Sequence, residues 1–398
     1  MYKLFTIKRY LEQILMWPFI LIGKCIALTK PLKEEFDIFF FFPGYAIGGA
    51  ERVNAEIIKA FSDKKVIIYF TKNSPNNGMK HFFNLPNVTI REINKWADNK
   101  YIFWGNLIYR GICSQYINAQ SFPPIVFIGQ CNFAYKLTPH IKRNIKIHEL
   151  IHMFDSRFTW VWAPFVKFIN TRIIVGEIFK VKFGESYLKE GIPIKYLDRL
   201  RIIFYRLEFL PNKRQNRSWN LPLKVYYAGR GGPQKRVWII VKVIQKCREM
   251  NLPISFKLAG SFKNEMPQEF IDNGIYIGEL KGGEEMYNFH KQNDILLMTS
   301  AWEGFPLVIM EAMSFGAIPL VTNIDAIPEH ITNAQNGFLL NNINDENLLV
   351  NEIIENLLHL IEHHKNLDII SLNAYQYSLS NFSAEKFQKE YRNVLLEN

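Results

Sequence analysis

Cysteine is scarce in this chain, and its copies lie far apart. Cys25, Cys113, Cys131 and Cys247 form no C-x-x-C pair and no cluster with histidine. This spacing argues against a disulfide framework and against a structural zinc site, and it fits a reducing compartment. The sequence also lacks a D-x-D carboxylate pair. A magnesium-dependent phosphate site therefore has no obvious ligands, and we expect no metal and no other cofactor.

Glycine, proline and charged residues are no more frequent than in ordinary folded proteins. The 398 residues include Gly 22 and Pro 18, which excludes collagen-like and low-complexity chains. Charged residues make up 21% and hydrophobic residues 48% of the chain, so there is enough apolar material for large cores. The length predicts two or three domains.

Negative charge is scarce in the first half of the chain. Residues 1–224 carry 34 basic and 16 acidic residues, whereas residues 225–398 carry 14 basic and 21 acidic ones. This asymmetry indicates an anionic partner of the first half, either nucleic acid or an anionic membrane surface or lipid-linked substrate. No recognisable nucleic-acid-reading module accompanies the basic residues, so we expect no nucleic acid.

The N-terminal segment bears on the choice of anionic partner. Apolar residues recur at helical spacing from Leu4 to Ile14 among basic residues, and an apolar run, Ile14–Ile22, follows. The run is shorter than the ~20 residues of a spanning helix, and no small-residue cleavage site follows it. We therefore expect residues 1–32 to form a basic amphipathic helix in the membrane interface, and the protein to be cytoplasmic and peripheral at the inner face of the membrane. A helix packed on the protein's own surface and a signal-anchor are the alternatives.

From residue 36 onward, short apolar runs alternate with helical patterns. This alternation is typical of parallel sheets that helices cover on both faces. A polar stretch at 211–222 resembles a linker and divides the pattern into two series, which predicts an α/β fold of two doubly wound, Rossmann-like domains at 33–210 and 223–380 facing a cleft. The expected strands include Phe36–Phe42, Val66–Phe70, Val88–Ile90, Ile125–Ile128, Ile145–Ile151, Arg172–Val175, Val225–Ala228, Ile254–Ala259, Ile275–Ile277, Ile295–Met298 and Ile318–Val321, and the expected helices include Val161–Phe168, Gln234–Met250, Asp345–His363 and Ala384–Leu396.

The stretch Ala301–Gly316, after an expected strand, is the most informative in the chain. Pro306 suits the first position of a helix, whose free N–H groups would face the ends of the strands. Glu311 is the only charged residue between Gly304 and Ile324. A lone carboxylate among apolar residues is costly unless something binds it, and a ribose diol would do so. An internal Arg or Lys partner is the alternative, and Glu303 would reach the same place from the loop.

Two further loops follow expected strands. Arg230 and Lys235, in Gly229-Arg-Gly-Gly-Pro-Gln-Lys235, can converge on a diphosphate, although a solvated basic turn is the alternative. In the first domain, Gly48 and Gly49 would let the backbone approach a ligand just before a helix N-terminus, unless they form a plain strand-to-helix turn.

Histidines occupy two positions in Ile147-His-Glu-Leu-Ile-His152. The string would match the H-E-x-x-H zinc proteases if it formed a helix, but it lies where we expect a strand. At the carboxyl end of that strand, His152 can point toward a substrate hydroxyl, while His148 is more typical of a structural residue.

These motifs together resemble the retaining glycosyltransferases of family 4, which have the GT-B fold. The matching pieces are GGAERV at 48–53, GR-x4-K at 229–235 and E-x7-E at 303–311. The resemblance implies that Arg230 and Lys235 bind the donor diphosphate and that Glu311 binds the ribose. It also implies a C-terminal helix, residues 381–398, that returns to the first domain. One departure is Arg236, where the family often has glycine.

The resemblance implies further roles for the remaining candidates. Glu303 would contact the donor sugar as a catalytic residue, and His152 matches the family's first-domain histidine near that sugar. Donor contacts would also come from Gly48, Gly49, Gly304, Phe305 and Pro306.

The expected activity is that of a metal-independent, retaining hexosyltransferase. It would move a sugar from a UDP- or GDP-sugar to a glycan or lipid-linked acceptor in the synthesis of cell-surface polysaccharide or glycoconjugate. A catalytically silent, membrane-associated partner of a glycan assembly complex and a nucleotide-sugar epimerase are the alternatives.

Overall fold

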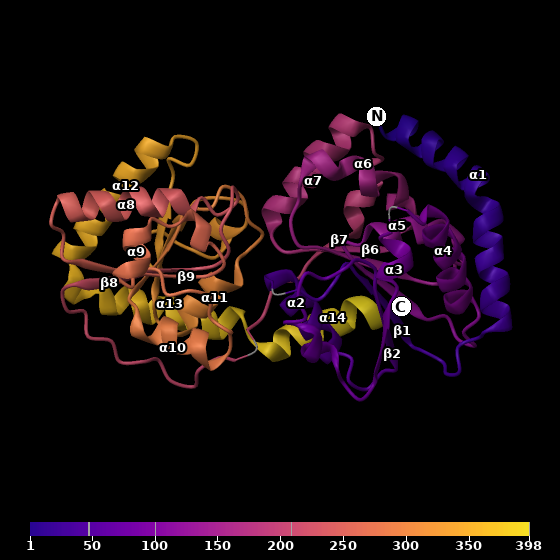
Figure 1. Ribbon diagram of the computed structural model, residues 1–398, viewed down its shortest axis with the longest axis horizontal. Helices are drawn as coiled ribbons and strands as arrows, with labels where there is room; N and C mark the ends of the chain where they lie inside the picture. The colour runs from indigo at the N-terminus through magenta and orange to yellow at the C-terminus, as the bar shows by residue number, and fades with distance from the viewer. Residues whose placement is uncertain (47, 100, 208, 398) are drawn as a thin grey trace. The chain divides into compact units, whose positions relative to one another are not determined.

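The computed structural model describes residues 1–46, 48–99, 101–207 and 209–397. The chain forms two compact units, each with its own parallel sheet (Figure 1). The first unit comprises residues 1–204 together with 385–398, and the second comprises residues 205–384. The predicted class, two doubly wound α/β domains, is confirmed.

The first unit is built on a seven-stranded parallel sheet in the order β3-β2-β1-β4-β5-β6-β7. Strands β1 and β2 are apolar and buried at all five positions, as expected where helices cover both faces of a sheet. The strand order reverses between β1 and β4, which is where ligands bind in open α/β sheets. The strands are β1 (Ile38–Phe42), β2 (Val66–Phe70), β3 (Val88–Glu92), β4 (Ile125–Gly129), β5 (Ile147–Ile151), β6 (Thr171–Ile174) and β7 (Leu200–Ile202).

Helices cover this sheet unequally. Helices α4 to α7 lie on one face, and α2 and α14 lie on the other (Figure 1). The helix expected over Val161–Phe168 is only partly correct, because the α-helix ends at Trp162 and a 3-10 segment with Pro164 in its first turn follows. The helices of this unit are α1 (Tyr2–Thr29), α2 (Gly49–Lys59), α3 (Asn94–Ala97), α4 (Phe103–Asn118), α5 (Asn132–Leu137), α6 (Thr159–Trp162), α7 (Glu177–Glu190) and α14 (Ala384–Leu396).

The N-terminal helix α1 lies along α4 with one face and leaves the other open. At the contact, a Cβ on Gly23 would stand 2.0 Å from the backbone oxygen of Ile108, so the two backbones nearly touch. Phe19 stacks on Trp104 with ring centroids 4.3 Å apart. The opposite face exposes large apolar side chains, among them Leu15 at 77%. The helix is long and apolar enough to cross a membrane by length and composition, with a mean hydropathy of 1.6.

The C-terminal helix α14 belongs to the first unit, as the resemblance implied. It buries Phe387, Tyr391 and Leu395. Arg392 binds the Asp63 carboxylate at 2.6 Å and the carbonyl oxygen of Ala60 at 2.9 Å, both at the end of α2. This return of the chain confirms the expected course of the last helix.

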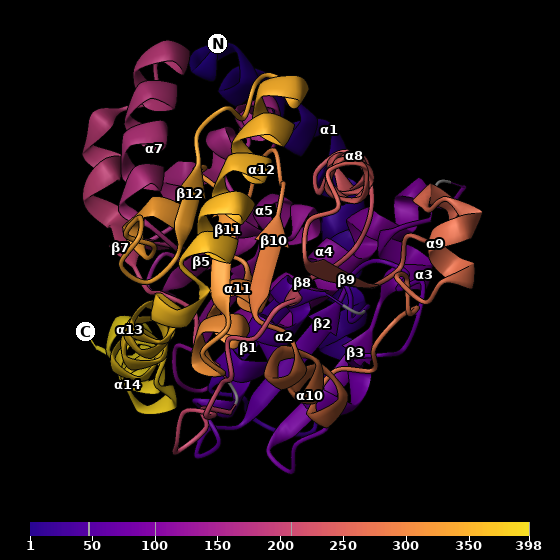
Figure 2. The same ribbon diagram turned by 90° about the vertical axis from the view of Figure 1, so that its left-hand side faces the viewer.

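The second unit has a five-stranded parallel sheet in the order β12-β11-β10-β8-β9 (Figure 2). Helices α8 and α12 lie side by side, as do α11 and α13. The expected strand Ile275–Ile277 is only an isolated bridge between Tyr276 and Leu258. The elements are β8 (Leu223–Ala228), α8 (Val237–Glu249), β9 (Ile254–Ala259), α9 (Gln268–Asp272), α10 (Glu284–Gln292), β10 (Ile295–Met298), α11 (Leu307–Ser314), β11 (Ile318–Thr322), β12 (Phe338–Leu340), α12 (Glu346–Glu362) and α13 (Leu367–Asn381).

The stretch expected to be a linker, 211–222, has no helix or strand but packs on the second unit. Arg214 forms two hydrogen bonds with the carboxylate of Asp368, at 2.8 and 2.9 Å. Arg217 donates to the carbonyl oxygens of His290 and Phe315. These contacts make the stretch part of the second unit rather than a free connection.

Candidate active site

In the second unit the candidate residues follow two neighbouring strands. Strands β8 and β10 pair in parallel, and the strand order reverses between them. The loops after both strands therefore meet at the switch point of the sheet, the usual ligand position in such folds. The first loop carries Arg230 and Lys235, and the second carries Glu303.

Lys235 and Glu303 form an ion pair with largely buried side chains. The Gln234 amide donates to the carbonyl oxygen of Trp302 at 3.0 Å, which ties the two loops together. The backbone N–H of Glu303 donates to the Asp325 carboxylate at 2.7 Å, which fixes the loop from its other side. The structure thus brings together two residues 68 positions apart that the motifs had assigned to one site.

The loop ends at the start of α11. Pro306 is the residue before this helix rather than its first residue, and Leu307 begins it. The Phe305 side chain turns into the core, where it stacks on His330 with ring centroids 4.0 Å apart. Any donor contact of Phe305 must therefore come from its backbone.

Glu311 is buried on α11, with 5% of its surface exposed. Its carboxylate lies 3.5 Å from Nε2 of His290 on α10. The other ring nitrogen, Nδ1, is within 2.6 Å of the Tyr226 hydroxyl. The basic group that the structure places beside this acid is therefore a histidine on the neighbouring helix.

Arg236 stands where the family often has glycine after the motif lysine. The backbone conformation at this position explains why glycine is favoured there. It is left-handed, with φ 50° and ψ 47°, a conformation that glycine adopts at little cost. The guanidinium offsets the cost with hydrogen bonds to the carbonyl oxygens of Thr299, Ser300 and Ile343 at 2.7, 3.1 and 2.7 Å. Burial lowers the pKa of Arg236. The loop keeps a glycine-like turn without a glycine.

Arg230 is exposed on the loop after β8. Its carbonyl oxygen accepts a hydrogen bond from the Tyr227 hydroxyl at 2.5 Å. Burial raises the pKa of Tyr227, and Glu303, Glu265 and Arg230 lie close enough to act on it electrostatically. The guanidinium therefore shares the neighbourhood of Glu303 without an ion pair of its own among the described residues.

The candidates of the first unit lie around the start of α2. Gly48 is the residue before the helix and Gly49 its first residue. His152 follows the carboxyl end of β5, and its Nε2 lies 3.3 Å from Oδ1 of Asn54 on α2. The backbone N–H of His152 donates to the side chain of Gln130 at 3.3 Å. Burial lowers the pKa of His152 to about 4, so its ring is neutral near pH 7 and suits hydrogen bonding to a hydroxyl.

The zinc-protease reading of the histidine string is wrong. Residues Ile147–Ile151 form the strand β5, so His148 and His152 do not share a helical turn. Within the described ranges, no three His, Cys, Asp or Glu residues gather where they could hold a metal ion.

The motifs missed several residues that support these candidates. Asp325, Asn54 and Gln130 each hydrogen-bond a candidate but belong to no motif. Two of them carry a backbone signal only the structure reveals, since Gln130 has φ 46° and Asp325 has φ 47°. Polar residues directly after predicted strands were the signal that could have pointed to Gln130.

Comparison with known proteins accords with this geometry. Residues 211–371 match the family model described as "Glycosyl transferases group 1". The resemblance to GT-B glycosyltransferases is confirmed. Anabaena HepE, solved in complex with UDP and glucose, superposes with a TM-score of 0.70 at 14% identity, covering 92% of this chain and all of that one.

Curated relatives of this glycosyltransferase-like chain are distant. An uncharacterized 41.2 kDa protein in the cps region of Klebsiella pneumoniae is 25% identical over 58% of this chain and 67% of its own. The lipopolysaccharide 1,2-N-acetylglucosaminetransferase of Salmonella typhimurium is 25% identical over 63% of this chain and 68% of its own. The alignments to the first three relatives span 46–67% of the relative's length.

Proposed function

We propose that the protein is a retaining glycosyltransferase that moves a hexose from a UDP- or GDP-sugar to a glycan or lipid-linked acceptor in cell-surface polysaccharide or glycoconjugate synthesis. The observation that carries the proposal is the Lys235–Glu303 pair at the switch point of the second sheet. The UDP complex of Anabaena HepE and the cps and lipopolysaccharide relatives support the donor class and the pathway.

In this reaction Arg230 and Lys235 would stabilise the diphosphate as it leaves the sugar. The bond between the anomeric carbon and the diphosphate oxygen breaks, and its electron pair leaves with the nucleotide. The acceptor hydroxyl forms the new bond on the same face, and its proton passes to the departing oxygen. Arg230 and Lys235 would hold the diphosphate as its charge grows, a preorganised electrostatic role that requires no metal.

The other candidates would position the donor. Glu311, beside His290, would accept hydrogen bonds from the ribose, and Glu303 would bind hydroxyls of the sugar. From the first unit, His152 would contact the sugar and the backbone of Gly48 and Gly49 the phosphates. The Lys235–Glu303 pair would hold both side chains in place before the donor arrives.

Nucleotide release from a panel of UDP- and GDP-sugars, with and without a chelator, tests the proposal. Lys235→Ala should lower kcat/KM about 100-fold, as loss of one transition-state donor does in other enzymes. Lys246→Ala removes a half-buried lysine of α8 that is bonded to Asn351; it is the matched control and should keep full activity. Equal rates for both variants would reject the site, donor turnover without acceptor would indicate an epimerase, and absence of nucleotide binding would indicate a silent partner.

A further inference from the structure

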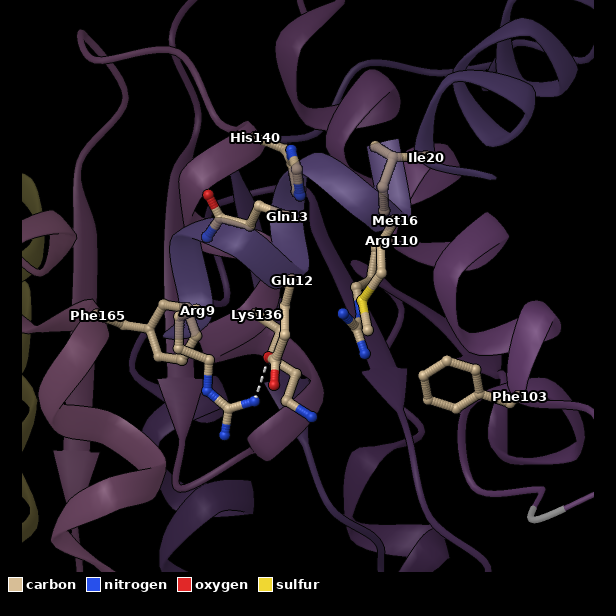
Figure 3. Close-up of a pocket in the computed structure, with 10 residues that line it drawn as sticks. All are labelled: Arg9, Glu12, Gln13, Met16, Ile20, Phe103, Arg110, Lys136, His140 and Phe165. Atoms are coloured by element: carbon tan, nitrogen blue, oxygen red, sulfur yellow. Dashed lines mark hydrogen bonds and ion pairs between the residues drawn. The ribbon is translucent and has the colours of Figure 1, made fainter. Parts of the chain in front are cut away.

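A cationic hollow lies inside the first unit, apart from the candidate active-site residues. It has a volume of about 170 Å³, several times the ~30 Å³ share of one liquid water. Its walls come from α1, α4, α5 with the 3-10 turn directly after it, and the 3-10 segment Ala163–Phe168 (Figure 3). We call this cavity the α1 hollow. The polar residues that line it are Arg9, Glu12, Gln13, Arg110, Lys136 and His140.

Positive charge in the α1 hollow exceeds negative charge. Arg9 binds Glu12 at 2.6 Å, the one ion pair recorded there for the described residues. Arg110 is only 6% exposed and bonds the side-chain oxygen of Asn106, a neutral group. Lys136 has no recorded hydrogen bond to a carboxylate within the described part of the chain. Arg9, half-buried Lys136 and buried Arg110 thus share the single carboxylate of Glu12, and neither Arg110 nor Lys136 forms an ion pair among the described residues.

Burial and neighbouring positive charge lower the pKa values of both cations. Burial, followed by the charge of Arg9, lowers the pKa of Arg110 to about 10. Burial, followed by Arg110 and Arg9, lowers the pKa of Lys136 to about 8. A bound anion would relieve both costs, because it would supply the missing counter-charge.

The geometry of α1 indicates where such an anion comes from. Arg9, Glu12 and Met16 point into the hollow, while the opposite face exposes a stripe of large apolar residues. Figure 3 shows the charged ends of Arg9 and Lys136 on either side of the Glu12 carboxylate. A helix with an apolar stripe on one face and a cationic hollow behind the other is complementary to a lipid surface, whose tails are apolar and whose headgroups carry phosphate. The exposed stripe is Leu4, Ile7, Leu11, Ile14, Leu15, Ile22 and Ile26.

We propose that the α1 hollow binds the phosphate of a lipid headgroup while the apolar stripe of α1 enters the membrane surface. The inference stands independently of the transferase activity, because no residue of the hollow belongs to the candidate active site.

Vesicle binding tests the proposal. Co-sedimentation of the full chain compares vesicles of phosphatidylcholine alone with vesicles that also contain phosphatidic acid. The wild type should bind the second kind more tightly, and Lys136→Gln and Arg110→Gln should each lose about tenfold of that preference. Lys136→Arg should retain it. Lys189→Gln, an exposed cation on α7, is the matched control and should bind as the wild type does.

Two further arms separate the sources of phosphate. Leu11→Ser with Leu15→Ser should weaken binding to both kinds of vesicle. It should leave the affinity for inorganic phosphate, measured by calorimetry, unchanged. Equal losses of the preference for anionic vesicles in the Lys189 and Lys136 variants would overturn the proposal. The attraction would then come from the overall positive charge of the protein rather than from the α1 hollow. Phosphate binding in solution without any vesicle preference would overturn the lipid source.

Discussion

Two buried arginines of the first unit have opposite surroundings. Arg172 on β6 is fully buried and bonds the Glu149 carboxylate at 2.6 Å and the Tyr187 hydroxyl at 2.7 Å. Although burial alone lowers its pKa, Glu149 and Tyr187 raise the net value. Arg110 on α4 is almost as buried, yet its bonded partner is the neutral side chain of Asn106, and its pKa falls.

The difference teaches how to separate a structural charge from a binding charge. A buried charge that is paired with an opposite charge inside the fold needs no ligand to balance it. Removal of either member of the pair leaves the other as an uncompensated charge in a low-dielectric interior. A buried charge that lacks a partner lowers stability until a ligand supplies one. Burial alone therefore does not indicate function, whereas burial with an unmet counter-charge does.

The largest effect is expected from the paired arginine. Arg172→Met leaves Glu149 buried without its cation and should lower the free energy of unfolding by about 3–5 kcal/mol. Urea denaturation followed by circular dichroism measures it. Arg143→Met, at an exposed position, should change stability by less than about 0.5 kcal/mol. The double variant Arg172→Met/Glu149→Leu should recover much of the loss. A loss below 1 kcal/mol would mean that the pair is not the internal match that its geometry suggests.

The next effect comes from the contact that closes the α1 hollow. A Cβ on Gly111 would stand 2.0 Å from the backbone oxygen of Ile20, so Gly111→Ala must push α1 away from α4. We expect a loss of about 1–3 kcal/mol in stability together with weaker vesicle binding. Gly184→Ala on α7 meets only Leu197 at 3.9 Å and should stabilise by about 0.5–1 kcal/mol. A stability change of the same sign for both substitutions would contradict the close approach of α1 to α4.

A smaller effect, of opposite sign, is expected from the unpaired lysine. Without ligand, Lys136→Met should raise the free energy of unfolding by about 1–2 kcal/mol near pH 7, after allowance for solvent screening. The pKa is about 8 in the fold against an ordinary 10.5, so the unfolded chain binds more protons between these values. Wild-type stability therefore rises with pH across that window, and its deficit against the variant should shrink. Urea denaturation across this pH range measures it, and Lys189→Met should show no such trend. The groups that face Lys136 are Arg9, Glu12, Arg110 and His140.

The meeting of the candidate residues in the second unit was largely predictable from the sequence because they lie in short motifs after strands. Lys235 and Glu303 follow neighbouring parallel strands, and the carboxyl ends of such strands share one edge of the sheet. The apolar run of β1 likewise predicted a strand covered on both faces. The partner of Glu311 was not predictable, because His290 lies on another helix, outside any motif.

The α1 hollow escaped sequence analysis for a physical reason. Arg9 precedes Arg110 by 101 residues and Lys136 by 127, and no spacing rule connects the three. They meet only because α1 lies on α4, a packing that depends on Gly23 and Gly111. The local backbone conformation was also not predictable, since nothing in the sequence shows that Arg236 is left-handed.

The smallest effect is expected at a buried basic group that loses its charge, in contrast to the two arginines. His148 on β5 is buried, and neither ring nitrogen has a hydrogen-bond partner within the described residues. Burial, with Lys146 nearby, lowers its pKa to about 4. An arginine cannot deprotonate in this way, which is why Arg172 needs an anion and His148 does not. Between about pH 4 and its ordinary value of 6.5, the unfolded chain binds the proton and the fold does not, so wild-type stability falls as the pH falls.

His148→Leu should therefore remove part of that acid sensitivity. The variant is expected to gain about 1 kcal/mol over the wild type at about pH 5 and to differ little near pH 7. Urea denaturation at both pH values measures the difference, and His81→Leu, at an exposed position, serves as the matched control. A gain of equal size at both pH values would show that packing rather than charge governs the site. The rule drawn from the arginines would then not extend to groups that can lose their proton.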